Sequence, residues 1–154
     1  MSDYRLRVAT LDDVDVLVHH RIAMFQDMGV PLDATAVDGA FRPWLLEMMP
    51  KGVYRAWVVD AGSRVISGGG ITILPWPPGP HYFSGRLAFV YNVYTEPDHR
   101  RRGLGRMVME AIHAWCREER IESLALNASR FGQSMYESLG YVVTPSPMMF
   151  FALE

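Results

Sequence analysis

The chain has 154 residues, 49% hydrophobic and 21% charged, and this balance is typical of a single globular domain over residues 1–154. A net charge of −2 argues against general nucleic-acid binding, no apolar run reaches the roughly 18 residues of a membrane span, and the five scattered histidines indicate no metal site. The N-terminus lacks a secretory signal and Cys116 is the only cysteine, so we expect a cytoplasmic protein without an internal disulfide.

The first half of the sequence predicts three strands and two helices. Thr10 and Asp13 are spaced as a capping box, so a helix is expected to begin there and to end at Gly29. A second helix is expected over 33–49, where Gly39 and Pro43 are points at which it could break. The strands are expected at 4–9, 53–60 and 65–74, the last with a bulge or a close backbone approach at residues 68–70.

The second half alternates strands and helices after a proline-rich loop at 75–80. A long strand over 86–95, a helix from Leu104 and a strand over 121–127 form one unit that we expect to be parallel and right-handed. A short helix over 131–139 should end at Gly140. A last pair of strands is expected at 141–143 and 148–153.

The most informative segment is VYTEPDHRRRGLGR at residues 93–106. An apolar strand ends at a proline, and four arginines then surround Gly103 and Gly105 before a helical pattern begins. Glycines leave room for a ligand, and the first N–H groups of a helix have no internal partner and carry partial positive charge. The segment therefore predicts a site for a polyanionic ligand, against the simpler interpretation of a solvated basic helix start.

A second motif, YESLGY at residues 136–141, follows one helix and one strand later. RRRGLG at residues 100–105 matches the pattern Gln/Arg-x-x-Gly-x-Gly/Ala, and together the two motifs resemble the GNAT superfamily of acetyl-coenzyme A-dependent N-acetyltransferases. The resemblance covers essentially the whole chain. It implies a three-layer α+β (mixed α/β) fold, in which a twisted, mixed and mostly antiparallel sheet of about six or seven strands is flanked by about four helices.

The resemblance also assigns roles within residues 93–106. It implies that the pantetheine arm of acetyl-coenzyme A (acetyl-CoA) pairs with the strand end at 93–95, and that the Val93 N–H donates to the thioester oxygen. The main-chain N–H groups at 102–106 would cradle the diphosphate. The implied cofactor contacts here are Val93, Tyr94, Thr95, Arg100, Arg101, Arg102, Gly103, Leu104, Gly105 and Arg106.

Tyr136 occupies the position at which this family often has a tyrosine that protonates the departing thiolate. Proton transfer from a phenol of pKa about 10 to a thiolate whose conjugate acid has a pKa of about 8.5 is only modestly uphill in free energy. Tyr136 also fits a packed aromatic residue on a short helix. Seven residues earlier, where the family commonly has an asparagine that binds the cofactor, this chain has Ser129. Asn127 could share that role, so Asn127, Ser129 and Tyr136 complete the expected contacts.

The group that deprotonates the acceptor amine is left open by the sequence. The strand over 86–95 offers Asn92 where some relatives have a carboxylate, and Glu96 is the nearest acid, although it also fits an exposed loop residue. Ordered water or Tyr91 is an equal alternative. We expect direct attack by a primary amine of a small molecule or peptide in a ternary complex, because Cys116 fits a packing position. A non-catalytic acyl-CoA sensor is the alternative function.

The resemblance places the acceptor pocket between the first two helices and the loops beside the central strand. Aromatic side chains with an occasional acid there suit an amine that carries apolar substituents, although each of them could instead pack the core. No metal is implied, and a homodimer is compatible with the family. The candidate pocket residues are Phe25, Asp27, Met28, Trp44, Trp76, His81 and Tyr82.

Overall fold

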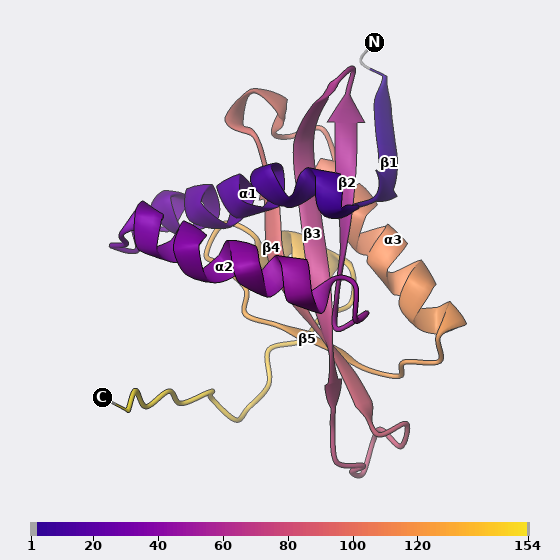
Figure 1. Cartoon of the computed structure of the whole chain (residues 1–154). Helices are drawn as coiled ribbons and strands as arrows, with labels where there is room; N and C mark the ends of the chain where they lie inside the picture. Colours follow the sequence, from indigo (N-terminus) through magenta and orange to yellow (C-terminus); the bar gives the residue numbers. More distant parts are fainter. Residues whose placement is uncertain (1–2, 154) are drawn as a thin grey trace.

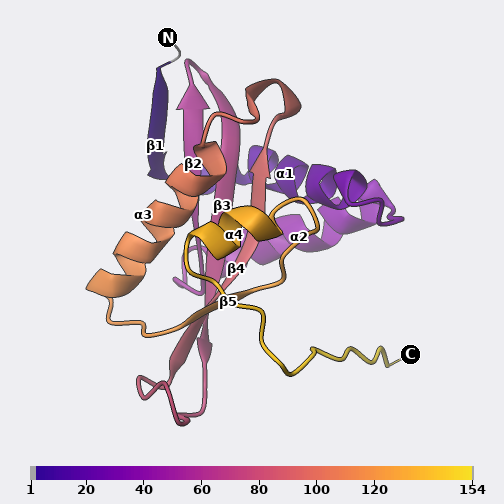
Figure 2. The same ribbon diagram turned by 180° about the vertical axis from the view of Figure 1, so that it is seen from behind.

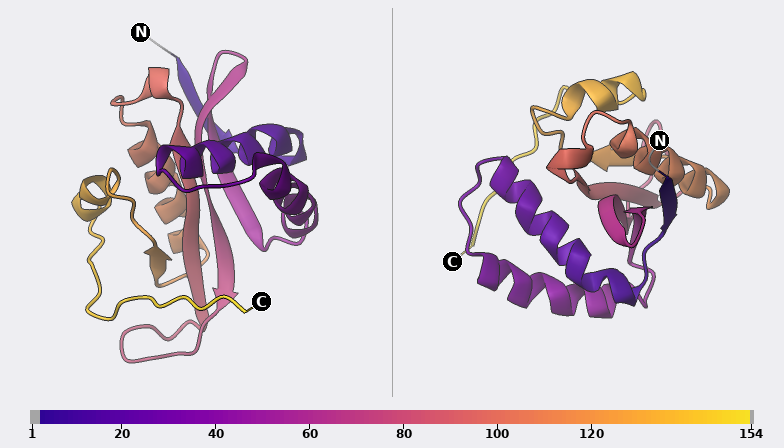
Figure 3. Two further views of the ribbon diagram at one scale, coloured as in Figure 1. Left: turned by 90° about the vertical axis from the view of Figure 1, so that its left-hand side faces the viewer. Right: turned by 90° about the horizontal axis from the view of Figure 1, so that it is seen from above.

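The computed structural model describes residues 3–153 and has three layers. One five-stranded sheet lies between helices α1 and α2 on one face and α3 and α4 on the other (Figures 1, 2 and 3). The strand order is β1-β2-β3-β4-β5, and every neighbouring pair is antiparallel except β4 and β5. The strands are β1 (Tyr4–Val8), β2 (Tyr54–Ala61), β3 (Arg64–Pro75), β4 (Arg86–Thr95) and β5 (Leu124–Leu126). The helices are α1 (Val14–Asp27), α2 (Ala34–Met48), α3 (Leu104–Glu118) and α4 (Gln133–Ser138).

The predicted capping box at the start of the first helix is confirmed. The Thr10 hydroxyl accepts from the Asp12 N–H at 3.3 Å, and the Asp13 carboxylate accepts from the Thr10 N–H at 2.8 Å. The first turn, Leu11–Asp13, is a 3₁₀ turn that leads directly into α1. Because the cap satisfies N–H groups that have no helical partner, it fixes where α1 crosses the sheet.

The second helix is continuous through both of its expected break points. Asp33 caps it by accepting from the Ala36 N–H at 3.2 Å, and Pro43 lies inside the helix. The proline removes one backbone hydrogen bond, but Leu45 is fully buried against the sheet and Phe41 packs on the same core. Tertiary packing of the apolar face therefore outweighs the weak helical preference of the segment.

The sheet has five strands rather than six or seven, which corrects the prediction for the end of the chain. Residues 141–143 and 148–153 form no strand, and the strand expected over 121–127 is only Leu124–Leu126. After α4 the chain runs away from the body (Figures 1 and 2). The apolar pattern at 148–153 resembles a strand, but a strand needs a neighbour that supplies the hydrogen bonds of a ladder. No strand of the described chain pairs with it.

The glycine run at 68–70 brings neighbouring strands unusually close, as the sequence predicted. A Cβ on Gly70 would lie 2.2 Å from the Tyr54 hydroxyl, and one on Gly68 would lie 2.9 Å from the Trp57 carbonyl oxygen. The register between β3 and β4 shifts here: Gly68 faces Tyr94 while Gly70 faces Tyr91. The single residue Gly69 therefore faces two residues of β4, which is a β-bulge.

Candidate active site

The site is built around β4, whose outer edge is only partly covered. β5 pairs with β4 from Ala88 to Val90, whereas β3 on the other side pairs with β4 as far as Thr95. Within residues 3–153, the backbone of 91–95 therefore has no β5 partner on that side. An extended chain can add to such an edge as one more strand, and this is the edge that the sequence assigned to pantetheine.

The bulge places Asn92 and Val93 on opposite faces of the sheet. Asn92 has a φ of +59°, a left-handed conformation uncommon outside glycine, and its buried side chain bonds to groups on the α1 side. Val93 lies on the α3 side, since a Cβ added to Gly69 would touch both Val93 and Val108. Two consecutive residues of β4 thus border both helical layers.

The turn before α3 has the conformation that the glycine motif predicted. Gly103 has a φ of +77° and occupies the N-cap position of α3 without any side-chain cap. The first helical bond runs from the Met107 N–H to the Gly103 carbonyl oxygen, so the N–H groups of 104–106 have no helical partner. A Cβ on Gly105 would lie 3.4 Å from Met135 and 4.0 Å from Val93. The start of α3, the bulge and α4 therefore meet at one point.

Arg100 is directed away from this turn and toward the α1 side. Its guanidinium donates to the Thr95 carbonyl oxygen at 2.8 Å and forms an ion pair with Asp27 at 2.6 Å. It also lies 5.4 Å from the centre of the Tyr94 ring. Arg100 must break the pair with Asp27 before it can reach a phosphate at the start of α3.

The three other arginines of the motif surround the start of α3. Arg101 is exposed and has a φ of +62°. Arg102 donates to the Tyr4 hydroxyl at 2.7 Å, and Arg106 contacts the Ser138 hydroxyl on α4. These cations, the helix dipole and the N–H groups of 104–106 all favour an anion at the same place.

Tyr136 on α4 packs against the core that α3 covers. Its ring makes an edge contact with Tyr141 at 5.8 Å, and burial raises the pKa of Tyr136 to about 12. Within residues 3–153 its hydroxyl has no hydrogen-bond partner. Ser129 accepts from the Gly132 N–H at 3.1 Å and so caps the turn before α4, whereas Asn127 is exposed.

Glu96 lies in a separate hollow and is not the exposed loop residue that the sequence allowed. It is 8% exposed, its Oε1 is 2.8 Å from the Nε2 of His19, and its other oxygen is 3.6 Å from Arg64. The hollow has a volume of about 400 Å³ and also includes Asp12 and Asp13. Glu96 is therefore held by His19 and Arg64 and is not among the residues that line the acceptor pocket described below.

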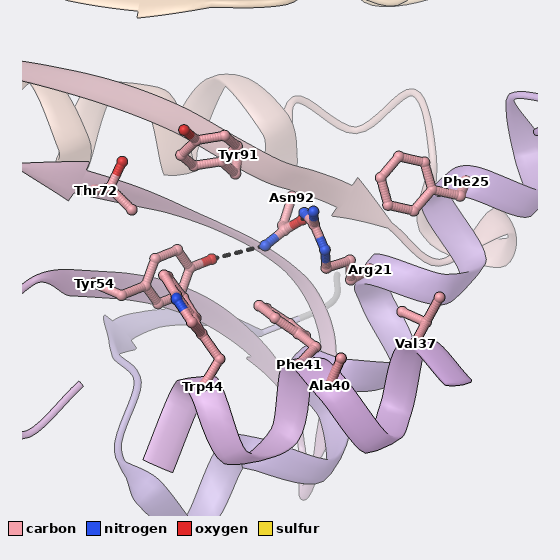
Figure 4. A pocket seen from close by; sticks show the side chains of 10 residues that line it. All are labelled: Arg21, Phe25, Val37, Ala40, Phe41, Trp44, Tyr54, Thr72, Tyr91 and Asn92. Atoms are coloured by element: carbon pink, nitrogen blue, oxygen red, sulfur yellow. Dashed lines mark hydrogen bonds between the residues drawn. The ribbon is translucent and has the colours of Figure 1, made fainter. Parts of the chain in front are cut away.

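A pocket of about 490 Å³ opens between α1, α2 and the sheet (Figure 4). Of the seven residues expected there, only Phe25 and Trp44 line it; Asp27 pairs with Arg100, and the hairpin residues 76–82 do not contribute. The full lining is Arg21, Phe25, Val37, Ala40, Phe41, Trp44, Tyr54, Thr72, Tyr91 and Asn92. Helical spacing could have suggested Arg21 and Phe41, which lie four residues before Phe25 and three before Trp44.

Three polar side chains form a chain of hydrogen bonds across this pocket. Asn92 donates to the Tyr54 hydroxyl at 2.9 Å, and Arg21 donates to the Asn92 carbonyl oxygen at 2.6 Å (Figure 4). The guanidinium of Arg21 also lies 5.0 Å from the ring centres of Phe25 and Phe41. Burial lowers the pKa of Arg21 and raises the pKa of Tyr54 to about 12. The pocket therefore presents aromatic walls and one cation beside the bulge.

Residues 3–153 also bear on the membrane, on metal binding and on the role of the single cysteine. Among these residues, no helix is long and apolar enough to span a bilayer, and no three His, Cys, Asp or Glu side chains are placed to share a metal ion. Cys116 is buried in the core under α3, and burial raises the pKa of its thiol to about 11. It packs the core, as its helical position predicted.

Residues 52–143 match the model of the GNAT acetyltransferase domain family. The structure is similar to that of a GNAT-type N-acetyltransferase from Ralstonia eutropha, with a TM-score of 0.88, 30% identity and coverage of 97% of this chain and 99% of that chain. A comparison with curated protein sequences found no significant match.

Two structures with lower identity share the fold and contain the coenzyme. One is a predicted acetyltransferase from Clostridium acetobutylicum with acetyl-CoA, with a TM-score of 0.89, 22% identity and coverage of 97% and 96% of the two chains. The other is an aminoglycoside N-acetyltransferase in complex with CoA, with a TM-score of 0.78, 16% identity and coverage of 99% and 96%. The chain belongs to the GNAT superfamily and is an acetyltransferase that uses acetyl-CoA.

Proposed function

We propose that the protein transfers the acetyl group of acetyl-CoA to a primary amine of a small molecule or peptide, by direct attack in a ternary complex. The observation that carries this proposal is the bulge at Asn92 and Val93. One of these neighbours faces the pocket between α1 and α2, and the other faces the start of α3 and α4. An amine in the pocket and a thioester along the β4 edge would meet there without a covalent enzyme intermediate.

The residues present fit the coenzyme at both of its ends. The uncovered edge of β4 at 91–95 offers backbone groups to the amides of pantetheine, with the Val93 N–H assigned to the thioester oxygen. The N–H groups of 102–106, Arg101, Arg102 and Arg106 are assigned to the phosphates. Arg100 joins them only after it leaves Asp27.

We assign Tyr136 to the departing sulfur. The amine nitrogen attacks the carbonyl carbon, the C–N bond forms, the C–S bond breaks, and the sulfur takes the proton of the phenol. With a pKa of about 12, complete transfer from Tyr136 alone is uphill by about 5 kcal/mol. Tyr136 therefore acts first as a hydrogen-bond donor to the sulfur. Its proton moves to the sulfur as the amine nitrogen releases a proton through solvent.

For removal of the first proton from the ammonium, the pocket favours Tyr91 with bound water over Glu96. Tyr91 lines the acceptor pocket, whereas Glu96 lines the other hollow and is paired with His19. Glu96→Gln is therefore expected to retain most of the transfer rate, and Tyr91→Phe to lower it. A transfer rate that falls more in Glu96→Gln than in Tyr91→Phe would assign the deprotonation of the amine to Glu96.

We also propose a homodimer, which the end of the chain supports. Met149, Phe150 and Leu153 are about nine-tenths exposed, at 90%, 91% and 88%. Monomeric proteins rarely expose such a contiguous apolar segment, so a surface of a second copy would cover it.

The test of the function is transfer itself, read against coenzyme binding. Purified protein is mixed with acetyl-CoA and a panel of amines, and thiol release is followed while calorimetry measures acetyl-CoA affinity. Tyr136→Phe is expected to lower the single-turnover rate at least about tenfold, about 1.4 kcal/mol, with affinity changed less than about twofold. Affinity that falls while the rate holds would make Tyr136 a packing residue. Tight binding without thiol release from any amine would favour an acyl-CoA sensor.

A further inference from the structure

The acceptor pocket contains one charged side chain, and that charge is positive. Arg21 is the cation, and no Asp or Glu lines the pocket within the described residues. The acids nearby in the fold are already paired: Asp27 with Arg100, and Asp15 and Asp38 with Arg42. A polycationic amine would therefore meet Arg21 without any counter-charge, and like charges at a binding site oppose each other.

Arg21 itself lacks an anionic partner. Within residues 3–153 it takes part in no ion pair, and its recorded hydrogen bond is the one from Nη1 to Asn92. A guanidinium has five N–H donors in a planar fork, so most of its donors remain for a ligand. The rings of Phe25 and Phe41 hold it in place, and burial lowers its pKa because nearby water is displaced. A desolvated guanidinium without an anion is costly, and a carboxylate is its geometric match.

The place of Arg21 limits where the anion can sit in the acceptor. Arg21 touches Asn92, and Asn92 directly precedes Val93, to which we assign the thioester oxygen. An anion held by Arg21 would thus lie close to the reacting point, so it must belong to the same small part of the molecule as the amine. The walls that Val37, Phe41 and Trp44 form are apolar and suit a hydrophobic side group.

We propose that the acceptor is a free amino acid with an apolar or aromatic side chain, whose carboxylate pairs with Arg21 beside Asn92. This inference rests on the proposed function and names the acceptor class for it. A pocket of about 490 Å³ is of the size that takes such a small molecule. A peptide N-terminus and a simple arylamine both lack the carboxylate, and are therefore expected to be poor acceptors.

The test uses three probes that differ only at the carboxylate: L-phenylalanine, L-phenylalaninamide and 2-phenylethylamine, with spermidine as a polycation. For the native protein, kcat/KM is expected to be at least about tenfold higher for phenylalanine than for the other three. Arg21→Gln is expected to lower kcat/KM for phenylalanine at least about tenfold. For L-phenylalaninamide and 2-phenylethylamine, which lack the carboxylate, kcat/KM should change by less than about twofold. Arg21→Lys should restore part of the loss. Arg5→Gln, an exposed position on β1 outside the pocket, is the matched control and should resemble the native protein.

A binding measurement separates this inference from the activity. N-acetyl-L-phenylalanine and N-acetyl-2-phenylethylamine are titrated into the CoA complex, with calorimetry and the tryptophan fluorescence, to which Trp44 of the pocket contributes, as readouts. Native protein should prefer the carboxylate, and Arg21→Gln should lose that preference while its CoA affinity stays unchanged. Equal acetylation of all three phenyl probes, preference for spermidine, or an equal loss on all probes in Arg21→Gln would overturn the carboxylate assignment while amine acetylation stands. CoA binding without transfer to any amine would overturn both.

Discussion

At the scale of single residues, Gly103 has a conformational role at the start of α3. Its φ of +77° is in the left-handed region, and a Cβ would meet nothing within 4 Å. The protein around Gly103 therefore has room for a side chain; what the turn requires is the backbone conformation. In the proposed function, this conformation directs the N–H groups of 104–106 toward the diphosphate of the coenzyme.

Gly103→Val is expected to weaken acetyl-CoA binding at least about tenfold, which is about 1.4 kcal/mol, because the strained turn misdirects these N–H groups. Calorimetry on the folded variant measures it. Gly85→Val is the matched control, since Gly85 has the same φ of +77° and an equally open environment in the β3–β4 hairpin. It should lose similar stability and keep its affinity. Equal affinities in both variants would contradict the phosphate turn.

His20 makes stability depend on pH. Its ring is 1% exposed, its Nε2 has no hydrogen-bond partner, and burial lowers its pKa to about 4. The unfolded chain, with a pKa near about 6.5, binds the proton first, so the stabilising contribution is present above about pH 6.5 and is lost as pH falls toward about 4. Between pH 7 and 4.5 the native protein should lose about 2 kcal/mol more than His20→Leu in urea unfolding, by the same linkage. His81→Leu, in the exposed hairpin, should behave like the native protein; an identical pH slope in His20→Leu would contradict the assignment.

The roles that could be read from the sequence are those whose determinants are local. The glycine turn before α3, the capping box and the glycine run each lie within a few consecutive residues. Arg21 with Asn92, His19 with Glu96 and Asp27 with Arg100 could not be read, because their partners are 71, 77 and 73 residues apart. Only the fold brings α1 onto β4, and so decides which acids and cations face the pocket.

At the scale of elements, the glycine run of β3 allows a side chain of β2 to reach a side chain of β4 across β3. The missing side chain of Gly70 makes room for the ring of Tyr54, whose hydroxyl accepts from Asn92. Asn92 in turn holds Arg21. Strand packing and pocket chemistry are therefore linked through one position.

Gly70→Ala is expected to destabilise the fold by about 2 kcal/mol, because the new Cβ must displace the ring of a buried tyrosine. Chemical denaturation measures the free energy of unfolding. Gly39→Ala is the opposite control: Gly39 is exposed on α2 with open space around it, and the change should stabilise by about 0.5–1 kcal/mol. A Gly70→Ala variant as stable as the native protein would contradict the close packing.

The elements that sequence patterns predicted well are the ones with strong periodicity. α3 begins at Leu104 and β4 spans 86–95 as expected, since α3 has a continuous apolar face and β4 is a long, half-buried strand. The strands predicted at the end of the chain failed because an apolar pattern cannot specify its partner. Met148–Leu153 has the composition of a strand but pairs with nothing in the described chain.

At the scale of the whole molecule, the exposed end of the chain contrasts with the packed layers. The body buries its apolar residues on both faces of the sheet, in two cores. The segment after Tyr141 leaves that body (Figure 3), and its apolar side chains are left to solvent or to another copy. The proposed homodimer would remove this exposure.

Removal of the residues after Val143 tests that proposal. The full chain is expected to sediment as a dimer of the 17.5 kDa protomer at micromolar concentration, and the truncated chain as a monomer. The truncated protomer should keep its free energy of unfolding within about 0.5 kcal/mol in dilute solution, since the deleted side chains bury little surface. A full-length chain that sediments as a monomer would contradict the dimer.

The central claim is that acetyl-CoA lies along the uncovered edge of β4 with its diphosphate at the start of α3. A crystal structure of the protein with acetyl-CoA tests it most directly. The account predicts pantetheine amides within hydrogen-bond distance of residues 91–95, the thioester oxygen at the Val93 N–H, and the diphosphate on the N–H groups of 102–106. A coenzyme bound elsewhere, or a thioester remote from the bulge at Asn92 and Val93, would contradict it.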